Sequence, residues 1–431
     1  MIYLTNAAVS PMTSHHIALI RPLFRQALIY TAATVLVLSS AASIAALPDD
    51  LIAELQETLS RDMTEAIDAK LIAGGSAIIV TADQVLLRKG YGHADLTTRK
   101  VFSPDSPVVL ASVTKPIVAT AAARAVSLGL ISFDDRVDIY LPAFRSVTLR
   151  AGGDPLSAPT IAQLLSHTGG VLGNTQRNAW LRELTNRART AGEPAPESIN
   201  EVVVSALATD GFRYPPGSEF RYSGLGFNIV AMILQQVTET DDYQTAIDTL
   251  LFAPLGRETL TFRPDATLIA NMPMRYNLRN GELQPAGRIN PRPRFGYINA
   301  GGSLVGSLDD LASIVQLHLN HGKHGGKRLI RKKVLKALYV RQPNARDRGM
   351  GFRVGEPGDD GAGAYLRHGG ASGTILWFDL DTGLGGAILT QTPARQTRGL
   401  ALRMQVELLN VARRMMGFEP VASANAREAS N

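Results

Sequence analysis

The stretch SAIIVTADQVLLRKGYG, residues 76–92, decides the fold that we expect for this chain. Its apolar, strand-forming runs lie on either side of Ala82 and Asp83, which predicts two strands joined by a turn. Strand-like runs return near the other end of the chain, in GMGFRVG, AYLRHG, SGTILWFDL and GGAILTQT between residues 349 and 392. We therefore expect an α/β (α+β) protein whose two chain ends build one sheet together.

Between these strand-rich ends the sequence is mostly helical. Apolar residues recur at helical spacing in TIAQLLSHTGG (residues 160–170) and in SGLGFNIVAMILQQVTE (residues 223–239). Asn280 and Gly281 then suggest a hairpin in a proline-rich segment. We expect a sheet subdomain at about residues 47–150 and 300–418, an inserted helical subdomain at about 151–299, and a disordered tail at 419–431. A cleft between the two subdomains is the natural place for a site.

The N-terminus has the pattern of a secretory leader. Arg21 and Arg25 precede an uncharged stretch from Ala27 to Pro48 that ends in small residues around SIAA. We expect a signal peptide at about residues 1–46 and an exported protein, either periplasmic or secreted. The alternative is an uncleaved membrane anchor, for which the apolar stretch is just long enough. The chain has no cysteine, so its stability cannot depend on disulfides.

Charge and histidine spacing argue against nucleic acid and metal as partners. The formal charge of +6 is small for 431 residues, and the densest basic run, Lys323–Lys333, has no interleaved aromatic residues to stack bases. His318, His321 and His324 raise the question of a metal site, but no carboxylate lies close in sequence to complete one. We expect no metal, no cofactor and no nucleic-acid partner.

The segment ASVTKPIVAT, residues 111–120, carries a serine three residues before a lysine at the head of an alanine-rich helix that Gly129 is expected to end. On a helix these two residues share a face, so Lys115 would project beside Ser112. A serine hydroxyl needs such a neighbouring base to attack a carbonyl. The alternative is that Ser112 caps the helix and Lys115 is a surface lysine. The stretch alone is compatible with both interpretations.

Two further motifs follow in a known order. SVTK at residues 112–115, YSG at 222–224 and HGG at 368–370 resemble the S-x-x-K, Y-x-N and K-T-G or H-x-G motifs of the serine beta-lactamase and penicillin-binding-protein superfamily. Connecting phrases such as LLSHTGG agree as well, and the resemblance covers roughly residues 50–415. It is most similar to the branch with class C beta-lactamases, D-alanyl-D-alanine carboxypeptidases and family VIII esterases. It implies an antiparallel sheet flanked by helices, with the inserted helical domain described above.

The resemblance implies a catalytic role for four side chains. Ser112 would be acylated, and Lys115 and Tyr222 would share the role of base. His368 would stand where other members carry the lysine of K-T-G, close enough to hydrogen-bond Tyr222 or a substrate carboxylate. His167, in LLSHTGG, is interpreted as a structural residue that holds a loop.

The same resemblance implies a backbone oxyanion hole and one departure from the pattern. The N–H groups of Ser112 and Ala371 would bind the oxyanion, and Gly369 and Gly370 would let the substrate approach the strand. The third residue of Y-x-N is Gly224, which has no side-chain amide to hydrogen-bond a substrate amide. Gly224 and His368 together move the expected chemistry away from efficient beta-lactam hydrolysis.

The resulting expectation is an exported serine hydrolase that forms an acyl-enzyme on Ser112. Its substrate would be a small ester, a beta-lactam or a D-amino-acid peptide of the peptidoglycan type, and we expect a monomer. Membrane contact is expected if the leader is uncleaved. The alternative, motivated by Gly224, is a catalytically weak penicillin-binding or cell-wall-binding protein of the same fold.

Overall fold

The computed structural model describes residues 47–174, 211–288 and 298–421, apart from residues 49, 258, 359 and 360, together with residues 190 and 203. The expected signal peptide and residues 422–431 of the expected tail lie outside the described residues, so both stay predictions. Within the described ranges, none of the helices combines the length and the apolar character needed to span a bilayer.

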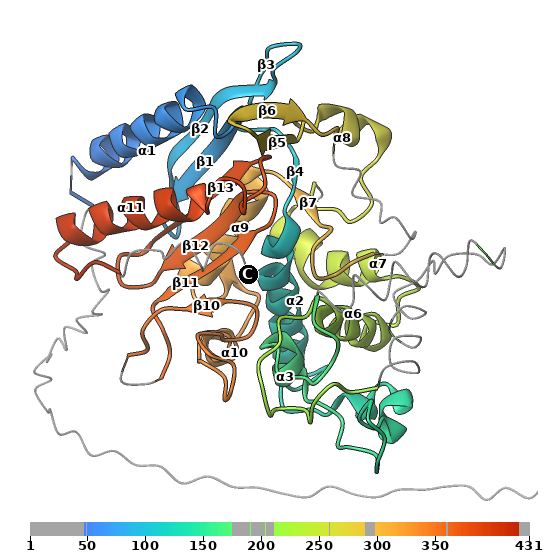
Figure 1. The fold of residues 1–431 in the computed structure, drawn as a ribbon. Coiled ribbons are helices and arrows are strands. Elements are labelled where there is room, and N and C mark those ends of the chain that lie inside the picture. Colours follow the sequence, from blue (N-terminus) through green and yellow to red (C-terminus); the bar gives the residue numbers. More distant parts are fainter. Residues whose placement is uncertain are drawn as a thin grey trace, which may run out of the picture. The chain divides into compact units, whose positions relative to one another are not determined.

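A seven-stranded antiparallel sheet forms the centre of the fold, in the order β10-β11-β12-β13-β1-β2-β3 (Figure 1). In the middle of the sheet β1 pairs with β13, so that Ile78 lies opposite Ala387. The structure confirms the predicted fold class, because the N-terminal strands β1–β3 continue the C-terminal strands β10–β13 in one sheet. The strands are β1 (Gly74–Val80), β2 (Val85–Asp95), β3 (Lys100–Val101), β10 (Arg353–Val354), β11 (Tyr365–Gly370), β12 (Thr374–Asp379) and β13 (Leu384–Thr390).

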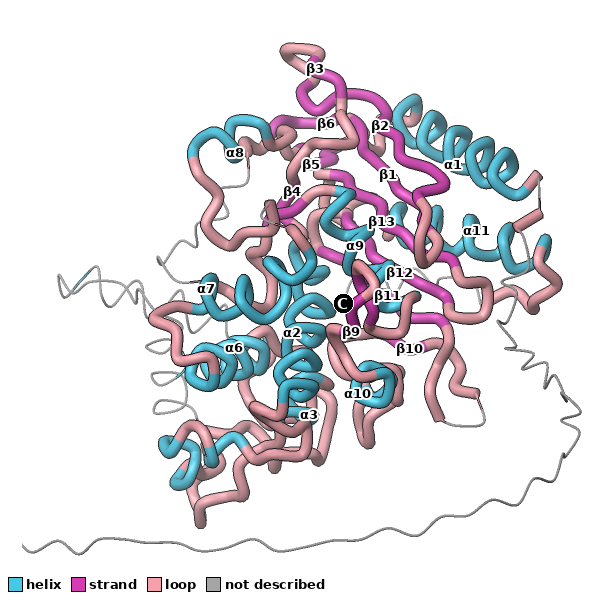
Figure 2. Tube along the Cα trace, turned by 180° about the vertical axis from the view of Figure 1, so that it is seen from behind, coloured by secondary structure: helices cyan, strands magenta, loops and turns pink. Residues whose placement is uncertain are grey.

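Helices cover both faces of this sheet. α1 (Leu51–Asp68) and α11 (Leu400–Met415) pack on one face, and α9 (Leu308–Leu319) packs on the other (Figure 2). Successive strand residues alternate between the two cores: Ile79 joins the core under α1 and α11, whereas Ile78 joins the larger core on the other side. Because both faces are covered here, the neighbouring strands β12, β13 and β1 are buried along their whole length and are mostly apolar in sequence.

The alanine-rich helix α2 (Thr114–Leu128) is almost completely buried, and α6 and α10 pack against it. As predicted, it ends at Gly129, whose φ of 78° is the left-handed conformation that glycine adopts without strain. The other helices are α3 (Ile161–Leu165), α6 (Leu225–Val237), α7 (Tyr243–Ile247), α8 (Ala266–Asn271) and α10 (Lys332–Ala337). Short 3₁₀ or π turns are η1 (Ala111–Val113), η2 (Val137–Ile139), η3 (Pro142–Ser146), η4 (Asp248–Phe252) and η5 (Ala253–Leu255).

Three two-stranded ribbons complete the described structure. The predicted hairpin is confirmed, since β5 and β6 flank Asn280 and Gly281, whose φ angles of 52° and 78° fit a tight type I′ turn. The ribbons are β4 (Val108–Val109) with β7 (Val305–Gly306), β5 (Tyr276–Arg279) with β6 (Glu282–Pro285), and β8 (Lys323–His324) with β9 (Lys327–Arg328).

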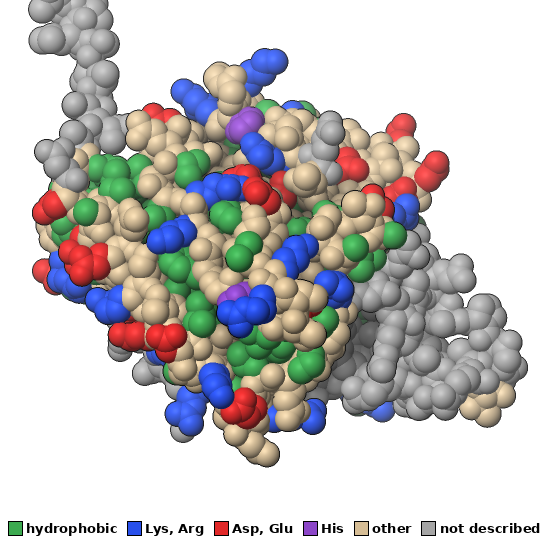
Figure 3. All heavy atoms as spheres, turned by 90° about the horizontal axis from the view of Figure 1, so that it is seen from above, with side chains coloured by type: hydrophobic (Ala, Val, Ile, Leu, Met, Phe, Trp, Pro, Cys, Tyr) green, Lys and Arg blue, Asp and Glu red, His purple; other side chains and the backbone are tan. Residues whose placement is uncertain are grey.

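Charged side chains of both signs are mixed on the surface. On the face shown in Figure 3, Lys and Arg side chains lie among Asp and Glu side chains and do not form one field. The basic run at residues 323–333 follows the β8–β9 ribbon to the start of α10, where Lys323, Lys327 and Lys333 are exposed.

His318 belongs to a buried hydrogen-bond chain. The Thr120 hydroxyl donates to the Pro116 carbonyl at 2.7 Å, so the contact of 2.9 Å between Thr120 and His318 Nε2 requires that the imidazole N–H donates there. His318 Nδ1 then accepts from the Tyr339 hydroxyl at 2.7 Å. Both ring nitrogens are therefore occupied by protein partners, and no cluster of three metal-ligating side chains exists among the described residues.

This network predicts a loss of stability in acid. Burial lowers the pKa of His318 to about 3, while an unfolded histidine has a pKa of about 6.5. Between these values the unfolded chain binds one more proton, so the free energy of unfolding falls by about 1.4 kcal/mol for each pH unit below 6.5. Urea unfolding of His318→Gln between pH 4 and pH 6.5 should show a slope against pH that is smaller by about this amount. His324→Gln, outside the network, should keep the wild-type slope; an equal change in both variants would contradict the assignment.

Candidate active site

Ser112 lies in the 3₁₀ turn that leads directly into α2. The preceding residue, Ala111, has a φ of 49°, a left-handed conformation that costs energy for any residue with a Cβ. The N-cap position of α2 falls on Val113 and has no side-chain cap, so the capping interpretation of Ser112 is not what the structure shows. Its hydroxyl oxygen instead accepts a hydrogen bond of 3.3 Å from Lys115 Nζ.

Lys115 is buried, with 1% of its surface exposed. Its ammonium donates to the Gly301 carbonyl at 2.6 Å as well as to Ser112. The ammonium also lies over two aromatic rings, 4.7 Å from the ring centre of Tyr222 and 5.6 Å from that of Phe227. The lysine is therefore fixed one turn from the serine, which is the geometry that the S-x-x-K spacing predicts.

Tyr222 lies beside this pair, just before α6. The residue as a whole is half-buried, but its hydroxyl is screened from solvent and has no hydrogen-bond partner within ordinary geometric limits. Burial raises the pKa of the Tyr222 phenol, but the positive charges of Lys115 and Arg348 and the proximity of Ser112 outweigh it, so its pKa is lowered. A lowered pKa suits a phenol that takes up and returns a proton.

His368 lies on β11 and faces Tyr222, with the two ring centres 6.3 Å apart. Its Nδ1 donates to the Gly369 carbonyl at 2.9 Å, which leaves Nε2 buried without a partner. Burial lowers the pKa of His368 well below its ordinary value, and the charges of Arg348 and Lys115 lower it further. The histidine is therefore neutral at pH 7, unlike the lysine whose motif position it occupies.

The turn between β11 and β12 is tied to the segment just before Ser112, at the end of β4. The Ser372 hydroxyl donates to the Val109 carbonyl and the Thr374 hydroxyl to the Leu110 carbonyl, each at 2.9 Å. These two buried bonds bring Ala371, which follows β11, next to Ser112 at the wall of one pocket. The two residues whose backbone N–H groups are expected to form an oxyanion hole thus line the same pocket.

Gly224 is hydrogen-bonded to Asn174, a residue that the sequence analysis did not single out. Its backbone N–H donates to Asn174 Oδ1 at 2.7 Å, and the Asn174 N–H donates to the Tyr222 carbonyl at 3.0 Å. A Cβ on Gly301 would come within 2.8 Å of the Gly224 Cα, so the backbone beside Lys115 packs closely here. Asn174 lines the pocket, whereas Gly224 is not among its described lining residues.

Arg348 is the second residue that sequence reasoning missed. It is buried, and its guanidinium carbon lies 5.5 Å from the ring centre of Tyr222. Burial, together with the charge of Arg353, lowers the pKa of Arg348 to about 10. The only hint in the sequence is the pair of glycines, Gly349 and Gly351, that follows Arg348. A Cβ on Gly351 would lie 2.6 Å from the Cβ of Ala119, so a glycine is needed where this loop packs against α2.

His167 supports the tyrosine from the other side. Its Nδ1 accepts from the Ser223 N–H at 3.1 Å, and its ring centre lies 4.4 Å from that of Tyr222. Burial lowers the pKa of His167 well below its ordinary value. These contacts agree with its interpretation as a residue that holds a loop.

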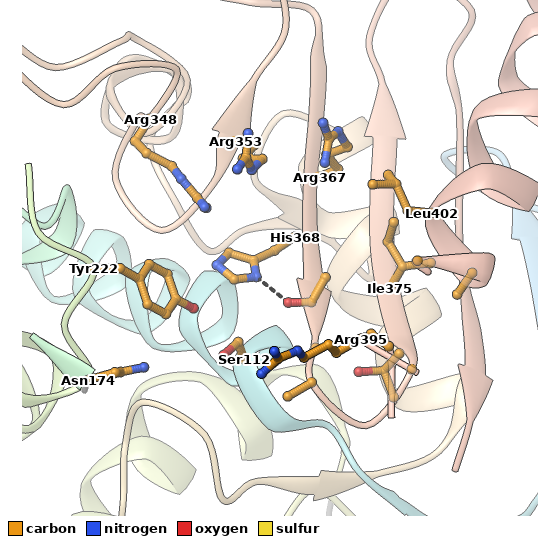
Figure 4. A pocket seen from close by; sticks show the side chains of 18 of the residues that line it. Ser112, Asn174, Tyr222, Arg348, Arg353, Arg367, His368, Ile375, Arg395 and Leu402 are labelled. Carbon is orange, nitrogen blue, oxygen red and sulfur yellow. Dashed lines mark hydrogen bonds between the residues drawn. The ribbon is translucent and has the colours of Figure 1, made fainter. Parts of the chain in front are cut away.

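A pocket of about 630 Å³ opens over these residues (Figure 4). Of the residues predicted from the sequence, Ser112, Tyr222, His368, Gly369, Gly370 and Ala371 line it. Lys115 is not among the described lining residues, but its Nζ contacts Ser112, which is. The structure therefore brings the three motif segments to one cavity of a size that suits a small ligand.

Comparison with known proteins identifies one family. The Beta-lactamase family profile matches residues 49–410 of the chain. Protein flp of Staphylococcus aureus strain MW2 is 26% identical over 250 residues, which cover 58% of this chain and 46% of the relative. The chain thus spans about half the length of that relative. Esterase EstB of Burkholderia gladioli is 28% identical over 292 residues, covering 63% of this chain and 72% of the esterase.

Solved structures share the fold. EstCE1, described as a hydrolase with promiscuous acyltransferase activity, superposes with a TM-score of 0.68 at 21% identity, covering 84% of this chain and 99% of EstCE1. The octameric penicillin-binding protein homologue from Pyrococcus abyssi superposes with a TM-score of 0.62, also at 21% identity, covering 86% and 78% of the two chains.

The bond between Thr374 and Leu110 predicts a stability loss. Thr374→Val keeps the shape of the side chain but removes one of two donors to the buried Leu110 carbonyl, which still accepts from the Val113 N–H. The loss of this bond should cost about 0.5–1.5 kcal/mol in urea unfolding. Thr249→Val is the matched control, because the Thr249 hydroxyl donates to the Thr245 carbonyl at an exposed position. It should change the free energy of unfolding by less than about 0.5 kcal/mol. Equal losses of unfolding free energy in the two variants would show that the buried Thr374 bond stabilises the protein no more than an exposed one.

Proposed function

This chain belongs to the beta-lactamase family, and on that premise we propose that it is an exported serine hydrolase that cleaves carboxylic esters through an acyl-enzyme on Ser112. One observation carries the proposal. The buried Lys115 Nζ lies 3.3 Å from the Ser112 hydroxyl oxygen and 4.7 Å from the ring centre of Tyr222, and both Ser112 and Tyr222 line an open pocket. Nucleophile, cation and phenol are thus within reach of one reacting carbonyl.

The proposed steps follow from these positions. Tyr222, as phenolate, takes the proton of Ser112 while the serine oxygen attacks the ester carbonyl, and Lys115 stabilises the negative charge on the phenol oxygen. The backbone N–H groups of Ser112 and Ala371 bind the oxyanion. Tyr222 then returns the proton to the leaving alcohol as the C–O bond breaks. Water attacks the acyl-enzyme in a second cycle of the same proton transfers.

Gly224 favours an ester over a D-amino-acid peptide. The residue has no side chain, so it offers no amide that could hydrogen-bond an acyl-amide group of a peptide or a beta-lactam. The similarity to esterase EstB supports the same choice. Comparison of p-nitrophenyl butyrate with a D-Ala-D-Ala peptide separates the two activities, and faster turnover of the peptide would reverse the choice.

A non-hydrolytic binding protein is the competing proposal. The absence of the Y-x-N asparagine supports it. The contacts of Lys115 with Ser112 and Tyr222 oppose it, because they are the contacts that an acyl-transfer reaction needs. Such a protein would gain nothing from a buried lysine aimed at a serine, because the burial of a charge is costly.

Covalent labelling is expected at Ser112 alone. A fluorophosphonate should add one adduct to the wild-type protein, because the activated hydroxyl attacks phosphorus as it attacks a carbonyl. Intact-mass measurement should find no adduct on Ser112→Ala, and Ser218→Ala, a surface control outside the pocket, should label like wild type. Persistent labelling of Ser112→Ala would disprove the assignment.

The proposal of export rests on the leader-like N-terminus, residues 1–46. The same intact-mass measurement, made on protein recovered from the periplasm or the medium of an expressing bacterium, gives the mature N-terminus. Cleavage near residue 46 supports export, whereas an intact N-terminus in the cytoplasmic fraction would contradict it.

The electrostatics of Tyr222 predict the pH dependence. Since the phenolate is the base, kcat/KM should fall as the pH drops through the pKa of Tyr222, which is lower than the ordinary value of about 10. Arg348→Gln removes one of the charges that lower this pKa, so the ascending limb should move to higher pH. Arg348→Lys keeps the charge and should move it less. An unshifted limb in Arg348→Gln would rule out this role of the arginine.

A further inference from the structure

The pocket over Ser112 is lined by arginines to an unusual extent. Among its described lining residues there are six arginines and no aspartate or glutamate. Glu219 pairs with Arg221 and Asp347 pairs with Arg353, and these two acids, which do not line the pocket, offset part of the positive charge. The remaining surplus of positive charge raises the local concentration of anionic ligands. The arginines are Arg221, Arg346, Arg348, Arg353, Arg367 and Arg395.

Arg348 differs from the surface arginines of the chain. It is 2% exposed, and its Nε is buried without a hydrogen-bond partner. Its contact with Asp347 is long, with 3.8 Å between Nε and the nearer carboxylate oxygen. Figure 4 shows its side chain directed towards Tyr222 and His368. A buried guanidinium with unused donor capacity, at the wall of an open pocket, is prepared to bind an anion bidentately.

Arg395 enters the same pocket from the opposite end. It belongs to the turn between β13 and α11, where the neighbouring Ala394 N–H donates to the Ala371 carbonyl at 3.1 Å and so joins this turn to the expected oxyanion hole. In the view of Figure 4, His368 and Ser112 are drawn between Arg348 and Arg395, and all four residues line the pocket. The reacting carbonyl would therefore have a guanidinium on each side.

We propose that this pocket selects esters with two negative charges, one on the acyl group and one on the leaving group, and that Arg348 and Arg395 each bind one of them. The inference rests on the proposed esterase function and adds its substrate class. The volume of about 630 Å³ accommodates a drug-sized molecule with both charged groups. Neutral esters would occupy the same cavity but would offer neither guanidinium group an anionic group of the ligand.

Four matched esters test the proposal. Phenyl hexanoate is neutral, 3-carboxyphenyl hexanoate carries a charge on the leaving group, phenyl hemiadipate carries one on the acyl group, and 3-carboxyphenyl hemiadipate carries both. Each charge should raise kcat/KM by about tenfold or more at low ionic strength, as expected for a charge-assisted hydrogen bond. The doubly charged ester should be the best substrate, and its advantage should shrink in about 0.5 M NaCl.

Two substitutions assign the charges. The readout is the ratio of kcat/KM for a charged ester to that for phenyl hexanoate, because a loss of rate common to all four esters cancels in it. Arg348→Gln should abolish the gain from one charge and Arg395→Gln the gain from the other. Arg341→Gln is the control, since Arg341 pairs with Glu356 and is not among the described lining residues of the pocket. Its ratios should equal those of the wild type.

The outcomes separate this inference from the proposed function. If wild-type protein hydrolyses phenyl hexanoate as fast as the doubly charged ester, the inference is overturned and the esterase proposal stands. It is also overturned if neither substitution changes the ratios or both abolish the same gain. If no ester is hydrolysed, the esterase proposal fails, and binding decides the inference. Calorimetry with Ser112→Ala protein must then find tighter binding of 3-carboxyphenyl hemiadipate than of either singly charged ester.

Discussion

The buried ammonium of Lys115 is the constraint on which the rest of the site depends. Removal of a charged group from water costs several kcal/mol unless protein groups replace the lost hydration. Here the replacement comes from the Gly301 carbonyl, the Ser112 hydroxyl and the faces of Tyr222 and Phe227. Three segments that are distant in sequence must therefore meet around one nitrogen atom. The same contacts that offset the burial of the lysine also set the positions of the nucleophile and the phenol.

The positive charge of the site comes from Lys115 and Arg348 and not from the two histidines beside them. His167 and His368 both lie near Lys115 and Arg348, and burial together with these charges lowers the pKa of each imidazole. The two histidines thus act as neutral hydrogen-bonding and packing groups around Tyr222. Arg348 adds a cation at the tyrosine in a protein whose motif position for lysine carries a neutral histidine.

Local patterns were sufficient to predict the elements of the fold, but not all members of the site. The strands around Ala82, the end of α2 at Gly129 and the Asn280–Gly281 hairpin each follow from a few adjacent residues, and the structure confirms them. Asn174 and Arg348 were missed because their importance comes from contacts across the chain. The glycines that follow Arg348 mark a close approach of the backbone, but only the structure shows that the approach is to Ala119 on α2.

The pairing of β1 with β13 has a consequence for the order of folding. The central strand of the sheet finds its partner almost at the other end of the described chain, with Gly75 opposite Thr390. Closing so long a loop is slow, because its entropic cost comes before any contact compensates for it. Until β13 is synthesised, β1 has an open edge. A nascent chain of this protein therefore cannot complete its central sheet until translation has passed β13, at residue 390.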